Sequence, residues 1–364
     1  MRVLYYYPAD NPMIARHVDM LCDNMPKEVE CHRATEVEQA KTLLEGGHYD
    51  LIHLHGCWRN SSKTVVYTAL KQGARLIITP HGQLEPWVQQ ENRWKEKMPK
   101  RVLYQQRIVA KAYCIILQGK MEEECMAKLG WNPRCVIIKN GVITSSITPR
   151  EMALQTSRLY RKVMDSNPLS LLTDQQQELL RDIITTGITE DQRWLTSQHH
   201  QTLDTEDWRR MLCYVTQEHI TDTFKRGIWV LRLEPADLQI DSADCFVPKD
   251  YEKPATIESV IGNQWVSENE RLIATFKYLK KLTSDKKLSI LHLIELDKEL
   301  RQHPCEEDKL CESLKEWRLY KFAARIMLLM NLKTGLTEGF MPMPPLNDKA
   351  AKNMRRQLNN RLSI

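Results

Sequence analysis

The sequence predicts an α/β fold: a Rossmann-like parallel sheet followed by a mostly α-helical domain of unrecognised type. Up to about Pro149, short apolar runs alternate with helix-like segments, a pattern typical of a parallel sheet covered on both faces. Beyond that point strand-like runs are few. With 364 residues the chain is long enough for two domains. We expect domains at 1–149 and 150–345, and a basic tail at 346–364.

Five strands are expected in the first part. They are Arg2–Tyr7, Leu51–His55, Arg75–Thr79, Ala112–Ile116 and Cys135–Ile138. The helix-like segments between them are Met13–Met25, Glu36–Glu45, Ser62–Gln72, a long segment near Glu91–Val109, and Gly119–Leu129. Right-handed crossovers bring the carboxyl ends of such strands, and the loops that follow them, to one edge of the sheet, where ligands bind.

The second part differs in amino-acid composition and is rich in Asp, Glu, Gln, Lys and Leu. Apolar residues at steps of three and four between Leu310 and Leu328 indicate helix. Another helix is expected to begin at Asp174, with Thr173 as its N-cap. The clearest strand-like run is GIWVLRL, Gly227–Leu233.

Composition indicates a protein of the cytoplasm. The start of the chain reads as a strand without a cleavage site, and no apolar stretch is long enough to span a bilayer. Ten cysteines are scattered without a C-x-x-C pair, so we expect reduced thiols.

The net positive charge lies entirely in residues 1–149, where Lys and Arg outnumber Asp and Glu by 20 to 15. Much of this excess falls between Arg93 and Lys111, among apolar residues, which favours an amphipathic basic helix. Two interpretations stay open: contact with an anionic membrane surface or acceptor, or an ordinary solvated face. The residues assigned to membrane or anionic-ligand contact are Arg93, Lys95, Lys97, Lys100 and Arg101. No aromatic interleaving or known motif accompanies the basic residues, so no nucleic-acid partner is expected.

Three segments of the first part carry a resemblance to a known family. They are YDLIHLH at Tyr49–His55, TPHGQLEPW at Thr79–Trp87 and VIIKNGV at Val136–Val142. Their sequences, order and spacing are similar to the N-terminal, acceptor-side domain of GT-B glycosyltransferases of the group 1, family 4 type, which act in bacterial polysaccharide biosynthesis. The resemblance covers about two-fifths of the chain.

The resemblance implies a sugar-binding edge with His81 in the catalytic position. A strand that runs into Thr-Pro-His-Gly places the imidazole at the sheet edge, where it can donate to a sugar hydroxyl or a phosphate oxygen. The candidate substrate-binding residues are His55, Trp58, Gly82, Glu85, Asn140 and Gly141. His53 and His55 share one face of their strand. No Cys or acidic residue with suitable spacing lies near them, so neither a metal nor another cofactor is expected.

Departures from the family leave the activity open. The loop Pro8–Met13 has no glycine, whereas the family uses a glycine-rich loop there to bring backbone to the donor phosphate. After residue 150, the second Rossmann half that would hold a nucleotide diphosphate is not recognisable.

Two hypotheses follow. In the first, the chain is a glycosyltransferase of surface polysaccharide or glycolipid synthesis, with a glycan or lipid-linked sugar as acceptor and a nucleotide sugar as hexosyl donor. It would lie in the cytoplasm, at or near the inner surface of the membrane. In the second, the chain is a non-catalytic binding or regulatory module that retains the acceptor-side fold.

Overall fold

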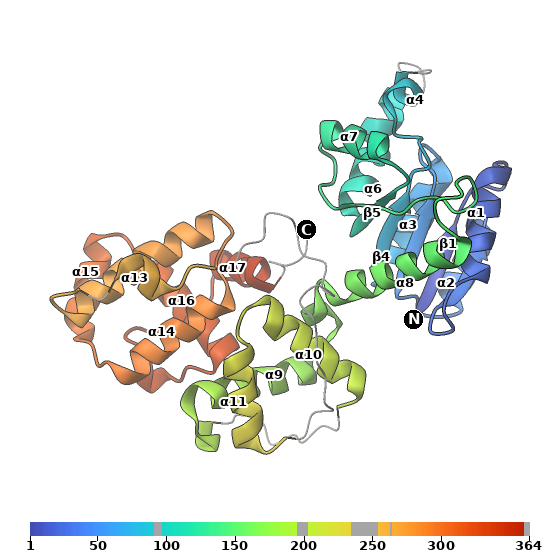
Figure 1. Ribbon diagram of the computed structural model, residues 1–364. Helices are drawn as coiled ribbons and strands as arrows, with labels where there is room; N and C mark the ends of the chain where they lie inside the picture. Colours follow the sequence, from blue (N-terminus) through green and yellow to red (C-terminus); the bar gives the residue numbers. More distant parts are fainter. Residues whose placement is uncertain (91–96, 195–202, 234–253, 263, 360–364) are drawn as a thin grey trace. The chain divides into compact units, whose positions relative to one another are not determined.

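The computed structural model describes residues 1–90, 97–194, 203–233, 254–262 and 264–359 (Figure 1). Two compact units divide the described chain. The first comprises Met1–Met164, and the described residues after it belong to the second. Each is described by itself.

A six-stranded parallel sheet forms the centre of the first unit, with strand order β2-β1-β3-β4-β5-β6. The strands are β1 Arg2–Tyr6, β2 Glu30–Ala34, β3 Leu51–His55, β4 Arg75–Thr79, β5 Cys114–Leu117 and β6 Cys135–Ile137. The Rossmann-like sheet predicted from the apolar runs is confirmed, with one strand, β2, that was not predicted. All five strand pairs are parallel. The strand order reverses between β1 and β3, and ligands of such sheets bind beside the carboxyl ends at this position.

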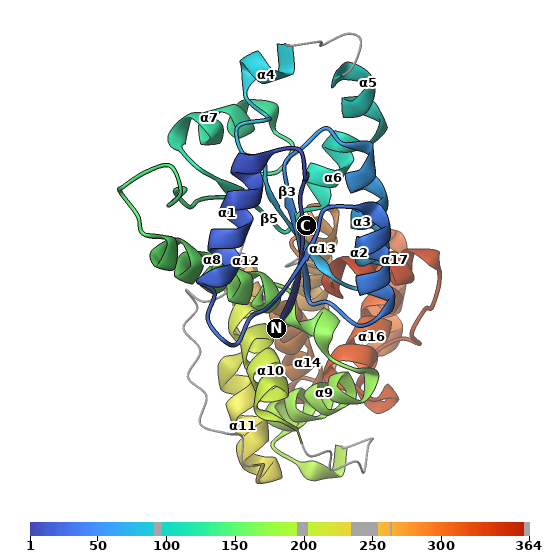
Figure 2. The same ribbon diagram turned by 90° about the vertical axis from the view of Figure 1, so that its right-hand side faces the viewer.

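Helices cover both faces of this sheet, and Figure 2 shows α1 on one side and α2 and α3 on the other. Their bounds are α1 Pro12–Asp23, α2 Val37–Glu45, α3 Asn60–Lys71, α4 Pro86–Gln90, α5 Met98–Lys100, the π-helical η2 Arg101–Gln105, α6 Gln106–Lys111, α7 Lys120–Leu129 and α8 Pro149–Asp165. The predicted basic segment is thus divided among α5, η2 and α6 in its described part. Residues 91–96 lie outside the described residues.

Helix α8 packs with the sheet although it follows residue 149. The buried Tyr160 of α8 hydrogen bonds to Tyr5 at 3.0 Å and to His53 at 2.6 Å. At the helix end, the guanidinium of Arg75 donates to the carbonyls of Val163 and Met164. These contacts satisfy carbonyl groups that a helix C-terminus leaves unpaired, and they attach α8 to the first unit.

All regular secondary structure among the described residues of the second unit is helical. Its elements are η3 Pro168–Leu171, α9 Asp174–Thr189, η4 Gln192–Trp194, α10 Thr205–Gln217, α11 Thr221–Leu231, α12 Ile257–Ile261, α13 Glu268–Ser284, α14 Ile290–Gln302, α15 Glu307–Glu316, α16 Tyr320–Thr334, η6 Glu338–Phe340 and α17 Lys349–Asn359. The predicted start at Asp174 is confirmed, because Thr173 and Gln176 form a reciprocal capping box.

Parts of two segments of this unit, Gly227–Leu233 and residues 346–364, form helix where the sequence pattern indicated a strand and a tail. The run Gly227–Leu233 was expected to be a strand, which is wrong, because Gly227–Leu231 form the second half of helix α11. Part of the segment expected to be a basic tail forms helix α17, which buries Ala351, Met354 and Leu358 against the unit. Helix α17 is amphipathic, so its basic residues occupy only the exposed side.

Candidate functional site

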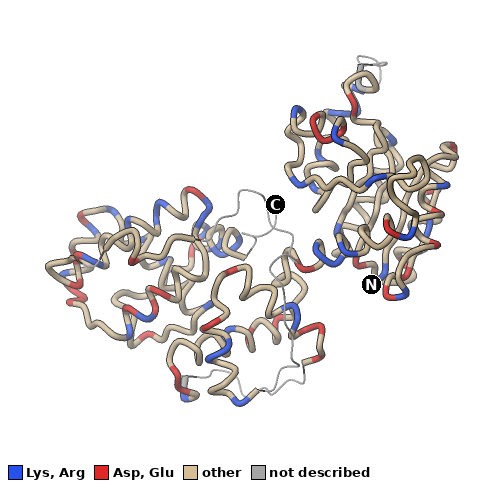
Figure 3. Tube along the Cα trace, viewed as in Figure 1, with Lys and Arg blue, Asp and Glu red and all other residues tan. Residues whose placement is uncertain are grey.

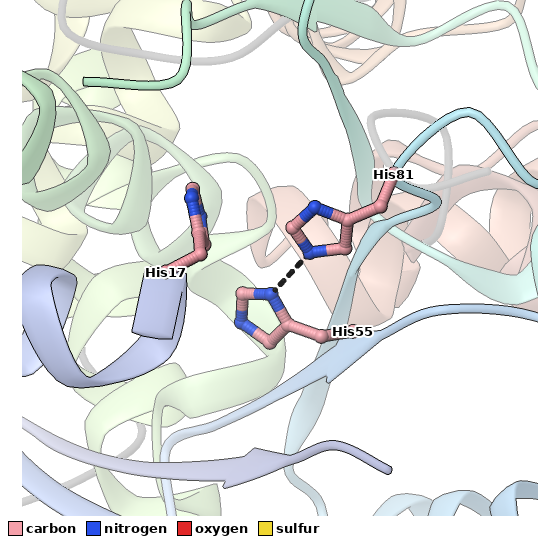
Figure 4. A group of neighbouring side chains, drawn as sticks. All are labelled: His17, His55 and His81. Carbon is pink, nitrogen blue, oxygen red and sulfur yellow. Dashed lines mark hydrogen bonds between the residues drawn. The ribbon is translucent and has the colours of Figure 1, made fainter. Parts of the chain in front are cut away.

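The polar side chains of the first unit gather at the carboxyl ends of β1, β3 and β4. His55 is the last residue of β3, and His81 follows β4 by two residues. His17 comes from α1, the helix after β1. The rings of these three residues lie together, as Figure 4 shows, with centroid distances of 4.9 Å for His17–His81 and 5.3 Å for His55–His81.

The loops after β3 and β4 contain residues with left-handed backbone conformation. Trp58 and His81 have left-handed φ values of 68° and 53°, which are uncommon for residues other than glycine. Gly56 and Gly82 beside them have φ values of 83° and 75°. Such positions persist only where the surrounding structure holds them, and they cluster at functional sites. The loops after β3 and β4 are therefore the strained part of this edge.

Both ring nitrogens of His81 have partners. Nε2 lies 3.0 Å from Nδ1 of His55, and Nδ1 lies 2.8 Å from the amide nitrogen of Gln118. Burial, and next the charge of His17, lowers the pKa of His81 to about 3. Burial likewise lowers the pKa of His17, and lowers the pKa values of His53 and His55 much further. All four imidazoles are neutral at pH 7.

A second polar group surrounds Gly82. The carboxylate of Glu122, near the start of α7, accepts hydrogen bonds from the backbone nitrogens of Gly82 and Gln118. Glu85 is also buried, and burial, with the nearby charge of Glu122, raises its pKa. A ligand that uses the Gly82 nitrogen has to displace the Glu122 carboxylate.

Trp58 follows β3 and is 7% exposed. Its indole nitrogen donates to the carbonyl of Gln83 at 2.7 Å, and its ring packs edge-on against Trp131. One side borders a hollow of about 550 Å³, whose lining residues are Cys57, Trp58, Arg59, Asn60, Ser61, Gln83, Val88 and Lys100. Trp58 and Lys100, predicted for different roles, thus share one depression.

Asn140 and Gly141 follow β6, the last strand of the sheet. The Oδ1 atom of Asn140 accepts from Nδ1 of His17 at 3.0 Å and from the backbone nitrogen of Val142. A Cβ on Gly141 would lie 3.1 Å from the backbone of Thr148 and Pro149, so only glycine fits there comfortably. Asn140 belongs to the histidine cluster, whereas Gly141 serves packing.

The five basic residues predicted for anionic contacts are not equivalent. Arg93 and Lys95 lie outside the described residues. The ammonium group of Lys97 donates to the carbonyl of Val88, and the guanidinium of Arg101 lies 5.1 Å from the ring centre of Trp131. Lys100 lines the hollow beside Trp58.

Residues 22–141 match the family model of the glycosyl transferase 4-like domain. The first unit carries a glycosyl transferase 4-like domain. The resemblance seen in the three sequence segments is thereby confirmed. No curated protein matches the chain.

At this edge of the first unit, sequence reasoning missed His17, Gln118 and Glu122. The first of them left a readable signal. Ile14, His17, Val18 and Leu21 follow helical spacing, so His17 stands on the apolar side of its helix. It lies just before the matched residues. Gln118 and Glu122 gave no such signal, because their partners are backbone nitrogens and a ring distant in sequence.

Proposed function

We propose that this chain acts in hexosyl transfer for the synthesis of a bacterial surface polysaccharide or glycolipid, and that its sheet edge binds the sugar-containing acceptor. The observation that carries the proposal is the left-handed turn at His81 and Gly82, which follows β4 at the carboxyl edge of a glycosyl transferase 4-like domain. His81 would donate to a sugar hydroxyl or phosphate after releasing His55, and Glu85 would accept from hydroxyl groups.

We propose a nucleotide sugar as the donor. We also propose that the described residues 165–359 do not form the usual donor-binding domain. The proposal that this domain is missing is supported by the secondary structure of the described residues 165–359, which is helical and contains no strand. Lys, Arg, Asp and Glu are interspersed along these helices (Figure 3). A donor would have to be held by helical elements in a manner unlike a Rossmann half.

A non-catalytic binding module is the second candidate. It is favoured by the closed hydrogen bonding of the edge: both nitrogens of His81 are engaged, and Glu122 occupies the Gly82 nitrogen. In addition, Asn11 caps α1 in the glycine-free loop after β1, and Asp10 pairs with Arg59 there. A module with these features would hold a glycan or a lipid-linked sugar without transferring it.

Ligand-induced thermal stabilisation separates the two candidates. A panel of nucleotide diphosphates and nucleotide sugars at millimolar concentration is expected to raise the melting temperature for one nucleotide, because binding to the native state alone stabilises it. At about 100 times the dissociation constant the gain is about 2.7 kcal/mol, or roughly 5 to 10 °C. His81→Ala should abolish the shift produced by a sugar-containing acceptor, and the exposed His48→Ala should keep it.

No shift across the panel, combined with a shift for oligosaccharide or lipid-linked acceptors, would favour the binding module. An acceptor shift that survives in His81→Ala would contradict the position proposed for the acceptor site.

We also propose peripheral contact with an anionic membrane surface, which would bring the domain to a lipid-linked acceptor. Val102 and Leu103 on η2 are 66% and 65% exposed, and Trp87 on α4 is 54% exposed. Lys100 and Arg107 stand near them in the chain. Exposed apolar residues beside cations are the features that bind a helix to a lipid interface. Among the described residues, no helix has the length and apolar character needed to cross a bilayer.

Co-sedimentation with vesicles tests this contact. The chain is expected to bind vesicles that contain anionic lipid and to bind neutral vesicles less. A Val102→Ser, Leu103→Ser double variant should lose about 10-fold or more, since each buried CH₂ contributes about 0.8 kcal/mol. The matched control is Val266→Ser in the second unit, where the valine is 93% exposed. Equal binding by the double variant and the control would refute the contact.

A further inference from the structure

The cluster of His17, His55 and His81 has the composition of a metal site. One ring nitrogen from each residue lies within 4.8 Å of the other two. The three residues come from a helix, a strand end and a loop, so the fold brings them together (Figure 4). His17 and His55 are buried, at 6% and 1% exposure. The expectation that no metal binds considered only ligands close in sequence to His53 and His55, and so did not include His17.

The hydrogen bond of His17 leaves a lone pair available. Its Nδ1 donates to Oδ1 of Asn140, which also accepts from the nitrogen of Val142. In a neutral imidazole the other nitrogen, Nε2, then carries a lone pair. The arrangement is the one found around metal-binding histidines, whose second nitrogen donates to a carbonyl or carboxylate oxygen that fixes the ring.

The bonds of the other two histidines also fix their protons. The Gln118 amide nitrogen can only donate, so Nδ1 of His81 accepts and its Nε2 carries the proton. That proton is donated to Nδ1 of His55. Nε2 of His55 must then carry a proton, and this buried atom has no hydrogen-bond partner among the described residues. Burying such a donor without a partner costs about 1–3 kcal/mol. Hydrogen bonding within the cluster therefore does not explain why Nε2 of His55 is buried here.

We propose that His17, His55 and His81 bind a divalent transition-metal ion, with Zn²⁺ as the type case. Imidazole nitrogen is a preferred ligand of Zn²⁺, Cu²⁺ and Ni²⁺, and three histidines with an open fourth position form a known ligand set. Zinc–nitrogen bonds of about 2.0–2.1 Å in a tetrahedral site place the nitrogens roughly 3.3 Å apart. The His55–His81 pair already lies at 3.0 Å.

Metal binding requires one change of proton position. The ion takes the place of the hydrogen bond between His81 and His55, and the proton on Nε2 of His81 moves to Nδ1. The Gln118 amide turns so that its oxygen accepts that proton. Asn140 remains as it is and acts as a positioning residue for His17. The site exists whether or not the chain transfers a sugar, so it goes beyond the proposed function.

The test uses the full chain without a polyhistidine tag, stripped with a chelator. Co²⁺ titration followed by visible absorption, and Zn²⁺ competition against a chromophoric chelator, are expected to give one bound equivalent. His17→Gln and His81→Gln should weaken binding by about 100-fold or more, and Asn140→Ala by roughly 10- to 100-fold. The control His48→Gln removes an exposed imidazole at the opposite, amino-terminal edge of the sheet and should bind as the unaltered chain does.

Circular dichroism of each variant separates loss of a ligand from loss of the fold. The Co²⁺ spectrum of the unaltered chain is a measurement that needs no variant, since a nitrogen-rich tetrahedral site absorbs strongly in the visible range. Absence of a bound equivalent, or equal affinity in folded His17→Gln and the control, would overturn the proposal. Neither measurement involves a nucleotide or sugar, so failure here is distinct from failure of the proposed function.

Discussion

Acidification below about pH 6.5 is expected to destabilise the first unit steeply in the metal-free chain. Burial lowers the pKa values of His17, His53, His55 and His81 in the folded state. In the unfolded chain each imidazole takes up a proton near its ordinary pKa of about 6.5. The stability associated with the neutral rings is therefore complete above pH 6.5, and it is lost as the pH falls towards the folded values.

The expected magnitude is large because four groups act together. Each contributes about 1.4 kcal/mol per pH unit between its unfolded and folded pKa. For His81, whose folded pKa is about 3, the loss at pH 4.5 amounts to about 3 kcal/mol. His53 and His55, whose folded pKa values are lowered well below the ordinary value, and His17, whose pKa is also lowered, add to this loss. The combined loss is a large part of the usual free energy of unfolding of about 5–15 kcal/mol.

Hydrogen exchange of peptides from β3 and β4, measured with chelator between about pH 7.5 and 4.5, reports this unit separately from the helical one. After correction for the intrinsic pH dependence, the free energy of opening should fall steeply below pH 6.5. His53→Gln is expected to reduce the slope by about 1.4 kcal/mol per pH unit, and His48→Gln to leave it unchanged. A free energy of opening that stays constant down to pH 5 would show that these imidazoles are not held neutral.

The parallel sheet was predictable wherever a strand is apolar on both faces. Every residue of β3 and β4 is buried, and their sequences, LIHLH and RLIIT, carry that signal. Strand β2 has the sequence ECHRA and lies at the edge of the sheet, with one residue buried. An edge strand pairs on one side only and needs no continuous apolar run, so pattern alone could not find it.

In the helical unit, a local sequence pattern indicated the wrong type of secondary structure. GIWVLRL is apolar and β-branched, which favours a strand. In the structure Gly227 lies inside α11, where the backbone of that helix approaches Ile183 of α9. The packing of two helices, a contact between positions distant in sequence, overrides the local preference.

The histidine cluster could be predicted from the sequence only in part, because some of its contacts join residues that are distant in the chain. His55 and His81 stand in segments that resemble a family, and the strand pattern places both at the carboxyl edge. Their partners His17 and Gln118 come from outside these segments. The metal-site hypothesis therefore depends on tertiary structure, because no spacing in the sequence unites a helix residue with two strand ends.

Replacing Gly187 or Gly227 by alanine is expected to destabilise the helical unit by about 3 kcal/mol or more. A Cβ on Gly187 would lie 1.9 Å from the carbonyl oxygen of Thr223, and one on Gly227 would lie 1.9 Å from that of Ile183. Both obstacles are backbone atoms, so the helices α9 and α11 must separate. Overpacking of a core costs about 1–3 kcal/mol and more where backbone has to move.

The sign of this effect distinguishes packing from helix propensity. Alanine is favoured over glycine inside a helix by about 1 kcal/mol, so propensity alone predicts that both variants are more stable. Urea unfolding followed by circular dichroism measures the difference. Gly339→Ala serves as control, because no atom lies within 4 Å of the added methyl group, and its free energy of unfolding should change by less than about 0.5 kcal/mol.

The double variant gives the sharper result. Gly187 and Gly227 face each other across one crossing, so a separation forced by the first methyl group also makes room for the second. The combined loss should be smaller than the sum of the two single losses, with a coupling of about 0.5–3 kcal/mol. Strict additivity would mean that the two positions act through independent distortions, and stabilised single variants would mean that the helices do not cross in backbone contact.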